Sequence, residues 1–252
     1  MTKSDCDDLG FETQLRQPAQ QQHTDERGWL LRDKWLGFYD GSFAPHLPSG
    51  SSGSLDLLPW RSGTVSTQLV TYLARQKTEG RDRAAIELGC GTGENLVCLA
   101  RAFAQAVGID ISPVAVRAAG EALAAAGCAS ARAIVADVLA LPGELRGTFD
   151  FVFDCQTYQC VRKVDETAAA VAICSLLKPN GVLLLLTGNA DEPAERGPER
   201  LTREDLDRAF ASTGLVCEAC EPFRFEWTAA YRRQSEFSEP PLGWCSVWRR
   251  CV

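Results

Sequence analysis

The stretch AAIELGCGTGEN, residues 84–95, limits the possible folds more than any other part of the chain. A short apolar run is followed at once by Gly89, Gly91 and Gly93, which alternate with single residues. Glycine is favoured where the backbone turns sharply or approaches another group closely, because it has no Cβ. One glycine would satisfy a tight turn, so the repeated spacing indicates a loop that a ligand approaches.

From Arg83 onward, apolar runs of strand length alternate with segments of helical periodicity. We expect strands at 84–88, 106–110, 131–137, 149–154, 182–187, 215–225 and 244–250. We expect helices at 66–76, 94–103, 112–127, 165–177 and 202–214, and a turn at 178–181. This alternation predicts an α/β fold with a doubly wound sheet. The apolar run 182–187 is typical of a parallel strand that helices cover on both faces.

Two of the expected helices carry clear end signals. Ser112 is suited to an N-cap, Pro113 to the first helical position and Gly127 to the residue just beyond the end. Thr202 and Asp205 have the spacing of a capping box. These signals place both helices on connections between strands of the predicted sheet.

In a doubly wound sheet, ligands bind beyond the carboxyl ends of the strands, and the glycine loop follows the first strand. The loop also begins a helix, whose free N–H groups favour an anion. Dinucleotide-binding loops follow the pattern G-x-G-x-x-G, but Glu94 occupies the last glycine position here. The pattern E-L-G-C-G-T-G instead resembles the first motif of class I S-adenosylmethionine-dependent methyltransferases, and the resemblance extends over residues 83–188.

This resemblance implies a mostly parallel, seven-stranded sheet with an antiparallel last strand, and S-adenosylmethionine as the cofactor. Asp110 ends the second strand, where a carboxylate accepts both ribose hydroxyls, and Asp137 ends the third, where it accepts the adenine amino group. The cofactor-binding residues that the resemblance implies are Glu87, Gly89, Cys90, Gly91, Gly93, Asp110, Ile111, Asp137, Val138, Asp154 and Trp60.

The residues after the fourth strand, DCQTYQC, lie beside the transferred methyl group in such a fold. Asp154 is a candidate for accepting a proton or holding a cationic substrate, and Tyr158 for hydrogen-bonding the nucleophile. We take these two as the candidate catalytic residues. Cys155 is better explained as a small packing residue than as a methyl acceptor, and Thr157 as a residue that holds the loop or the cofactor.

The N-terminal part divides into an expected disordered tail, residues 1–24, and an aromatic cap segment, residues 25–65, before the methyltransferase-like domain at 66–252. The segment LPWRSG resembles the entry of thiol, halide and thiopurine methyltransferases, in which a Trp covers the cofactor. The aromatic residues either form a lid over the cofactor or dock the segment onto the core. They are Trp29, Trp35, Phe38, Tyr39 and Trp60.

The methyl acceptor is left open by the sequence. Resemblance to the thiol and thiopurine enzymes favours a small molecule, whereas VFDCQTYQCV partly resembles the segment after the fourth strand of seven-strand protein lysine methyltransferases. A small-molecule acceptor and a protein substrate are therefore both candidate partners. A cofactor-binding module that acts through a partner is a further alternative, and a nicotinamide-dependent oxidoreductase is a distant third.

The net charge of −7 and the pI of about 5.0 weigh against a nucleic-acid partner or an anionic membrane surface. The first residues, MTKSDCDDLG, lack the basic and apolar regions of a secretory signal. The longest apolar run, GVLLLLT, is shorter than the roughly 20 residues that span a bilayer. We therefore expect a cytoplasmic protein without a membrane segment. We also expect a monomer.

The chain has 11 cysteines, an odd number scattered over the expected strands and helices, which is typical of reduced thiols. Cys217 and Cys220 form a C-x-x-C within an expected strand, where residues three apart point to opposite faces. The two histidines are His23 and His46. Because no set of ligands converges in this pattern, we expect no metal site.

Overall fold

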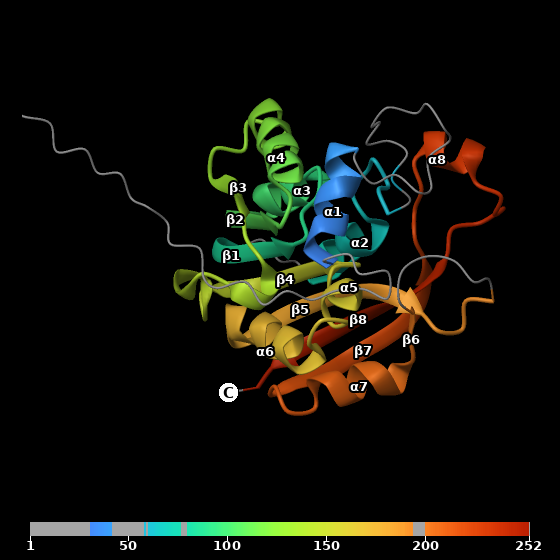
Figure 1. Cartoon of the computed structure of the whole chain (residues 1–252). Helices are drawn as coiled ribbons and strands as arrows, with labels where there is room; N and C mark the ends of the chain where they lie inside the picture. Colours follow the sequence, from blue (N-terminus) through green and yellow to red (C-terminus); the bar gives the residue numbers. More distant parts are fainter. Residues whose placement is uncertain (1–30, 42–57, 59, 77–79, 194–199, 252) are drawn as a thin grey trace, which may run out of the picture.

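The computed structural model describes residues 31–41, 58, 60–76, 80–193 and 200–251. The expected tail, residues 1–24, and Trp29 of the aromatic cap segment lie outside the described residues. The described part forms a single sheet with helices on both faces (Figure 1).

The eight-stranded sheet has the order β3-β2-β1-β4-β5-β8-β7, and β6 pairs with β5. All pairs from β3 to β5 are parallel, and β8 is antiparallel to both β5 and β7. The prediction of a mostly parallel sheet with an antiparallel last strand is confirmed, and β6 is a short addition. The strands are β1 (Gly80–Leu88), β2 (Phe103–Asp110), β3 (Ala131–Val135), β4 (Phe149–Cys155), β5 (Leu177–Asn189), β6 (Arg200–Leu201), β7 (Leu215–Arg224) and β8 (Leu242–Arg250).

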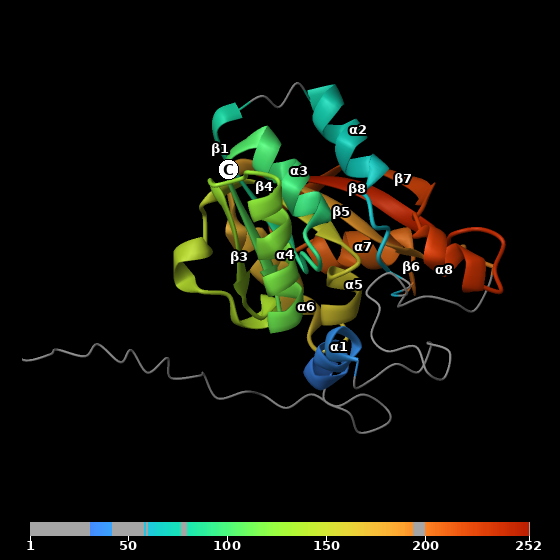
Figure 2. The same cartoon turned by 90° about the horizontal axis from the view of Figure 1, so that it is seen from above.

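Helices α2, α3 and α4 cover one face of the sheet, and α6 and α7 cover the other (Figure 1). Helix α1 packs beside α4, as the view from above also shows (Figure 2). No helix in the described ranges is long and apolar enough to cross a membrane. The helices are α1 (Leu31–Asp40), α2 (Thr67–Gln76), α3 (Glu94–Ala102), α4 (Pro113–Ala125), α5 (Tyr158–Val161), α6 (Glu166–Leu176), α7 (Arg203–Phe210) and α8 (Ala229–Gln234).

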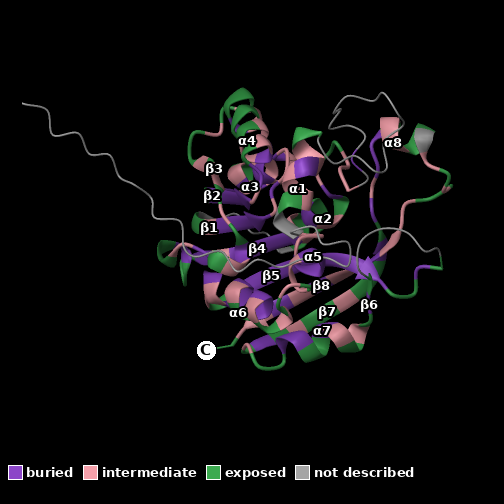
Figure 3. Cartoon of the chain, in the orientation of Figure 1, coloured by how far each residue is buried: buried purple, intermediate pink, exposed green. Residues whose placement is uncertain are grey.

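The apolar core lies on both faces of β5, which is buried from residue 181 to residue 189. Leu183 and Leu185 belong to the apolar cluster under α6 and α7, whereas Leu184 and Leu186 belong to the cluster under α2, α3 and α4. Figure 3 shows the central strands buried and the outer surfaces of the helices exposed. Because neither face of β5 meets water, its sequence has no polar alternation.

Three neighbouring strands bring acidic side chains to one edge of the sheet. Leu88 of β1 pairs with Ile109 of β2 and with Asp154 of β4. Glu87, Asp110 and Asp154 therefore lie near the carboxyl ends of adjacent parallel strands. This edge, which we call the carboxyl edge, is where doubly wound sheets bind ligands.

Two expected elements differ locally from the sequence-based boundaries. The turn predicted at 178–181 lies within β5, where Asn180 has a φ of 63° and the pairing with β4 shifts register, so the turn residues form an irregularity in the strand. Strand β3 ends at Val135 rather than at Asp137. The reason is that the Asp137 carboxylate accepts a hydrogen bond from the Leu139 N–H and caps a short 3₁₀ turn.

The prediction that Cys217 and Cys220 point to opposite faces is wrong. Both side chains pack against the same apolar cluster, together with Trp244. Strand β7 shifts its register against β8 between Cys217 and Ala219, and such a bulge interrupts the alternation of side chains. In the part of the chain that the structure describes, no group of three or more His, Cys, Asp or Glu side chains is suited to a metal ion.

The signals at the ends of α4 act as the sequence indicates. The Ser112 hydroxyl accepts a hydrogen bond from the Ala115 N–H, and Pro113 occupies the first turn. Gly127 follows the helix with a φ of 68°, which L-residues with a Cβ rarely adopt. The connection between β2 and β3 is therefore fixed at both ends of its helix.

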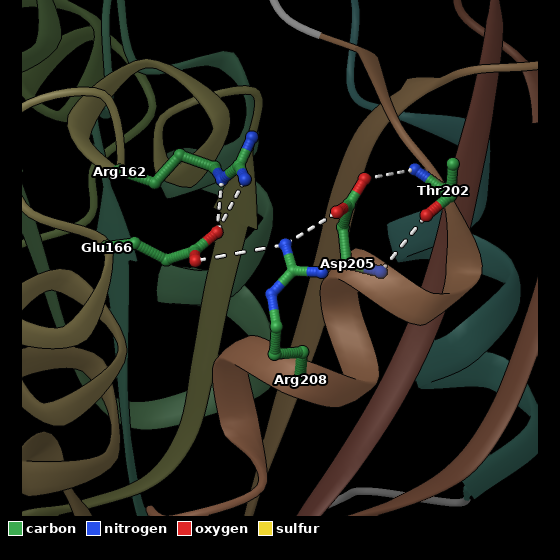
Figure 4. Close-up of polar contacts among 5 residues, drawn as sticks. All are labelled: Arg162, Glu166, Thr202, Asp205 and Arg208. Carbon is green, nitrogen blue, oxygen red and sulfur yellow. Dashed lines mark hydrogen bonds and ion pairs between the residues drawn. The ribbon is translucent and has the colours of Figure 1, made fainter.

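The start of α7 is held by a charged network that Figure 4 displays. Thr202 and Asp205 form the predicted capping box, in which each side chain accepts the other residue's backbone N–H. Arg208 lies 2.6 Å from Asp205 and 4.0 Å from Glu166 of α6, which also pairs with Arg162. The network joins α7 to α6 beneath the sheet.

We expect Asp205→Ala to lower the free energy of unfolding by about 1 kcal/mol at pH 7, because it removes half of the capping box. Hydrogen bonds from Thr202 and Arg208 lower the pKa of Asp205 to about 2. The stabilisation is therefore complete above the unfolded-state pKa of about 4 and is lost as the pH falls toward 2. Urea denaturation at pH 7 and at low pH measures both effects.

Asp207→Ala is the matched control, because Asp207 lies on the same helix and pairs with Arg203 at the surface. A surface pair of this spacing contributes at most about 0.5 kcal/mol. Equal losses in the two variants, or a loss for Asp205→Ala that does not change with pH, would contradict this role of the capping box.

Candidate functional site

The glycine loop between β1 and α3 has a positive φ at each glycine: 61° at Gly89, 51° at Gly91 and 90° at Gly93. A Cβ on Gly89 would lie 2.0 Å from the Thr157 hydroxyl, and one on Gly93 would lie 2.9 Å from the backbone of α4. These two glycines make room for the chain itself. A Cβ on Gly91 would instead lie 3.0 Å from the Tyr39 hydroxyl. The middle of the loop therefore faces the aromatic cap segment.

Asp110 holds the loop from the end of β2. Its Oδ2 accepts the Gly91 N–H at 3.0 Å, and its Oδ1 accepts the Ser112 N–H at 2.9 Å. Burial raises the pKa of Asp110, and these backbone bonds oppose the shift. Because each carboxylate oxygen has a second lone pair, both can accept a further hydrogen bond from a ligand.

Glu87 is buried beneath the same loop, with 2% of its surface exposed. Its Oε1 accepts a hydrogen bond from the Asn95 side chain at 3.2 Å, and the Asn95 oxygen accepts the Ser66 N–H at 2.8 Å. Burial raises the pKa of Glu87 well above its usual value. Its other oxygen, Oε2, has no hydrogen-bond partner within the described residues, and so it can accept a donor from a ligand.

Arg61 ties the segment before α2 to the first turn of α3. Its guanidinium lies 2.7 Å from Glu94 Oε1 and donates to the Thr92 hydroxyl at 3.0 Å. The helix N-terminus that follows the glycine loop is thus bordered by an acidic side chain and an arginine from the aromatic cap segment. The sequence pattern around Trp60 gave no indication of this pair.

The aromatic residues of the described cap segment pack around Trp60. Its ring centroid lies 4.8 Å from Phe38, 5.2 Å from Trp35 and 6.4 Å from Tyr39. Burial raises the pKa of Tyr39, and the charge of Asp110 adds to the increase. Tyr39 therefore lies next to both Gly91 and Asp110, at the carboxyl edge.

The end of β4 turns back onto the glycine loop. The Asp154 carboxylate accepts the backbone N–H groups of Thr157 and Tyr158, each at 3.0 Å. The Thr157 hydroxyl donates to the Leu88 carbonyl at 3.0 Å, which locks this turn onto β1. Complete burial raises the pKa of Asp154 to about 7, against the effect of the two amides. Its carboxylate thus holds the turn and is also poised between protonation states at neutral pH.

The remaining predicted site residues lie in different places in the structure. Tyr158 is fully buried, and its ring lies 5.2 Å from Phe210 of α7, on the face opposite α3 and α4. Asp137 is exposed beyond β3, whereas the neighbouring Val138 is buried. Ile111 follows Asp110 directly and is partly buried. Of the predicted residues, the glycines, Glu87, Asp110, Asp154 and Trp60 thus gather at the carboxyl edge.

Residues 85–181 match a family model described as a methyltransferase domain. The resemblance to class I methyltransferases is confirmed. The matched segment runs from β1 into β5, and so it includes the glycine loop, Asp110 and Asp154.

Curated relatives and solved structures agree with this family. Thiocyanate methyltransferase 1 of Brassica oleracea is 31% identical over 132 residues, and that of Arabidopsis thaliana is 32% identical over 133 residues. Each match covers 52% of this chain and 56% of the relative, so the chain spans about half the length of the curated relatives it matches.

Among solved structures, one concerns the conversion of a disulfide bond into a thioacetal group during echinomycin biosynthesis. It has a TM-score of 0.64 and 24% identity, over 77% of this chain and 85% of that chain. The cyclase SpnF has a TM-score of 0.59 and 21% identity, over 73% of this chain and 81% of that chain. A putative sarcosine dimethylglycine methyltransferase from Galdieria sulphuraria has a TM-score of 0.58 and 17% identity, over 73% of this chain and 84% of that chain. At these identities the likeness shows the fold.

The sequence indicated that Thr157 holds the loop and that Tyr39 forms a lid or a docking contact, but it did not reveal their partners at this edge. Sequence reasoning missed Asn95, whose side chain donates to Glu87, and Arg61, which pairs with Glu94. Such pairings depend on the tertiary fold.

We expect Gly93→Ala to lower the free energy of unfolding by about 2–4 kcal/mol. The added Cβ would overlap the backbone of α4 at 2.9 Å, and the φ of 90° would be strained as well. Urea denaturation followed by circular dichroism measures the loss.

Gly127→Ala is the matched control, because Gly127 also has a positive φ but no atom within 4 Å of an added Cβ. We expect it to cost about 1–2 kcal/mol, the conformational part alone. If both substitutions cost the same, the close approach of α4 to the glycine loop is not what requires glycine at position 93.

Proposed function

We propose that this protein transfers a methyl group from S-adenosylmethionine to a small-molecule nucleophile. The observation that carries this proposal is the Asp110 carboxylate, which accepts the Gly91 N–H at the middle of the glycine loop. A ligand with adjacent hydroxyls can use the free lone pairs of Asp110 while its remaining part lies over Gly91. The family match and the methyltransferase names of the curated relatives support the reaction class.

The described residues fit this cofactor. Asp110 is suited to the ribose hydroxyls, and the unpartnered Oε2 of Glu87 is suited to an ammonium donor. We assign the adenine side to Asp137, Val138 and Ile111. When bound, S-adenosylmethionine supplies a methyl group on a sulfonium that a nucleophile can attack. Cys90, buried in the loop, borders the same region.

The catalytic contribution of the chain is chiefly one of position. The protein must hold the acceptor in line with the bond that breaks, which accounts for a large part of the rate in such reactions. Asp154 remains the candidate for proton transfer, since its pKa of about 7 allows it to accept a proton at neutral pH. Tyr158 remains a prediction, and its place against Phe210 favours a packing role.

We also propose that Trp60 and Tyr39 cover the bound cofactor. Aromatic faces attract a sulfonium, and the Tyr39 hydroxyl already lies against Gly91. The alternative, that these residues only dock the cap segment, is consistent with the tight packing of Trp35 and Phe38 on Trp60.

Two other functions keep some support. A protein lysine methyltransferase would show label in the protein fraction when extract is incubated with radiolabelled cofactor, whereas a small-molecule enzyme would label small thiols or amines. The fold does not fix the reaction, because SpnF, a cyclase by name, has a similar architecture. A cofactor-binding module without turnover, which acts through a partner, is the alternative from another class.

We expect S-adenosylmethionine and S-adenosylhomocysteine, but not NADH, to raise the melting temperature. Binding to the native state alone stabilises it by about 2.7 kcal/mol at a hundredfold excess over Kd. Asp110→Ala should remove most of this shift, because it deletes the proposed acceptor for the ribose hydroxyls. Thermal denaturation with each ligand measures the response.

Asp150→Ala is a suitable control, since Asp150 lies at the other end of β4 and pairs with Lys178. It should lower the melting temperature without changing the ligand-induced shift. An unchanged shift in Asp110→Ala, or a shift with NADH, would contradict the cofactor assignment.

For the proposed cover, we expect Trp60→Ala to weaken S-adenosylhomocysteine binding by about tenfold, since contact with an aromatic face contributes on the order of 1 kcal/mol or more. Isothermal titration calorimetry gives the Kd, and circular dichroism shows whether the core stays folded. A folded variant with the wild-type Kd would assign Trp60 to docking alone.

A further inference from the structure

Two glutamines follow β4, and both are attached to the end of β5. The Gln156 N–H donates to the Leu186 carbonyl at 2.8 Å, and the Gln159 side-chain oxygen accepts the Gly188 N–H. These bonds continue the pairing of β4 with β5, whose last pair is Cys155 with Leu186. Both glutamines therefore lie at the carboxyl edge, on the side of β4 that is away from β1 and the glycine loop.

The Gln159 carboxamide is buried with its nitrogen unpartnered. The residue has 0% of its surface exposed, and Nε2 has no hydrogen-bond partner within the described residues. The bond from the Gly188 N–H identifies the oxygen, because a backbone N–H can only donate, and so the unpartnered atom carries two N–H donors. A buried donor without a partner is costly, and this one therefore favours a ligand that brings a hydrogen-bond acceptor.

The Thr187 hydroxyl is a second unpartnered group at the same place. Thr187 directly precedes Gly188, has 0% of its surface exposed and, in the part of the chain that the structure describes, makes no side-chain hydrogen bond. A hydroxyl can donate or accept, so the carboxamide N–H groups decide which ligands fit. A hydroxyl, carbonyl or carboxylate oxygen suits them, whereas an ammonium group, which has no acceptor, does not.

Gln156 has a φ of 69°, in the left-handed region that residues with a Cβ rarely adopt. Its N–H is bonded to Leu186, its carbonyl accepts the Cys160 thiol at 3.3 Å, and the Thr157 hydroxyl donates to Leu88. Bonds to β1, β5 and α5 thus enforce this conformation. Enforced strain of this kind is frequent where a chain binds a ligand, and the side chain is only partly buried.

We infer that Gln156 and Gln159 hold the methyl acceptor, and that the Gln159 carboxamide donates an N–H to an oxygen atom of the acceptor. The inference rests on the proposed function and deepens it, because it names the class of small molecule: a thiol or amine that also carries an oxygen. The subsite is distinct from the carboxylates assigned to the cofactor, since Glu87 and Asp110 belong to β1 and β2. Asp154, the candidate for proton transfer, lies on β4 between the two regions.

The test uses the full chain saturated with S-adenosylhomocysteine, whose binding is first established by calorimetry. Two pairs of similar size are then titrated and followed by ligand-observed NMR: 2-mercaptoethanol with 1-propanethiol, and ethanolamine with 1-propylamine. Within each pair, a hydroxyl replaces a methyl group. We expect at least one hydroxyl-bearing member to bind about three- to tenfold more tightly than its propyl counterpart, which is the range for one hydrogen bond.

Gln159→Met keeps the length of the side chain and removes its N–H donors. The advantage of the hydroxyl-bearing member should disappear, whereas the Kd of S-adenosylhomocysteine should stay at the wild-type value. Because the measured quantity is a ratio between two ligands, a general loss of stability does not produce this result. Circular dichroism shows whether the variant is folded.

Gln156→Gly tests the strained residue and keeps its backbone bonds. It should raise the melting temperature by about 2–4 °C, because glycine adopts a positive φ without strain. It should also weaken binding of the hydroxyl-bearing member by about threefold or more. Asn180→Gly is the matched control, since Asn180 has a φ of 63° near the other end of β5. It should raise the melting temperature by a smaller amount and leave ligand binding unchanged, because asparagine tolerates this region better.

Three results would overturn the inference: no hydroxyl-bearing member binds more tightly than its propyl counterpart, a folded Gln159→Met keeps the wild-type ratio, or Gln156→Gly binds as the wild type does. Failure of all four small molecules to bind would overturn it as well. If S-adenosylhomocysteine itself does not bind, the proposed function fails instead.

Discussion

The fit of the Thr157 hydroxyl over Gly89 is the contact on which the carboxyl edge depends. The hydroxyl donates to the Leu88 carbonyl and occupies the space that a Cβ at position 89 would need. It thereby joins the end of β4 to the end of β1, while the Asp154 carboxylate holds the same turn through its backbone amides. With the first glycine fixed in this way, Gly91 stays within reach of Asp110.

Much of the architecture follows from local sequence signals. Periodicity identified the strands from β1 to β5. The helix caps at Ser112 and Thr202 were predicted correctly, because a cap is a contact between residues only three positions apart in the sequence. The glycine spacing and the position of Asp110 likewise predicted that the carboxyl ends of β1 and β2 lie side by side. Gly89 and Gly93 also make room for Thr157 and α4, and the glycine spacing alone did not reveal these contacts.

The features that the sequence did not reveal are those that join distant segments. The contact of Tyr39 with Gly91, the Arg61–Glu94 pair and the bonds from Thr67 to Glu226 each need the whole fold to bring the partners together. The bulge in β7 shows a different limit. Alternation predicted opposite faces for a pair of cysteines, and one extra residue in the strand was enough to reverse that result.

The strand order also has a consequence for how the chain reaches its native state. β8 lies between β5 and β7, although β7 precedes it in the sequence. β7 therefore has no place beside β5 and joins the sheet only through β8. Until β8 docks, one edge of the most apolar strand, β5, is left without its partner, and such an edge invites pairing with other chains. Nascent or truncated forms that lack β8 are accordingly the ones most exposed to aggregation.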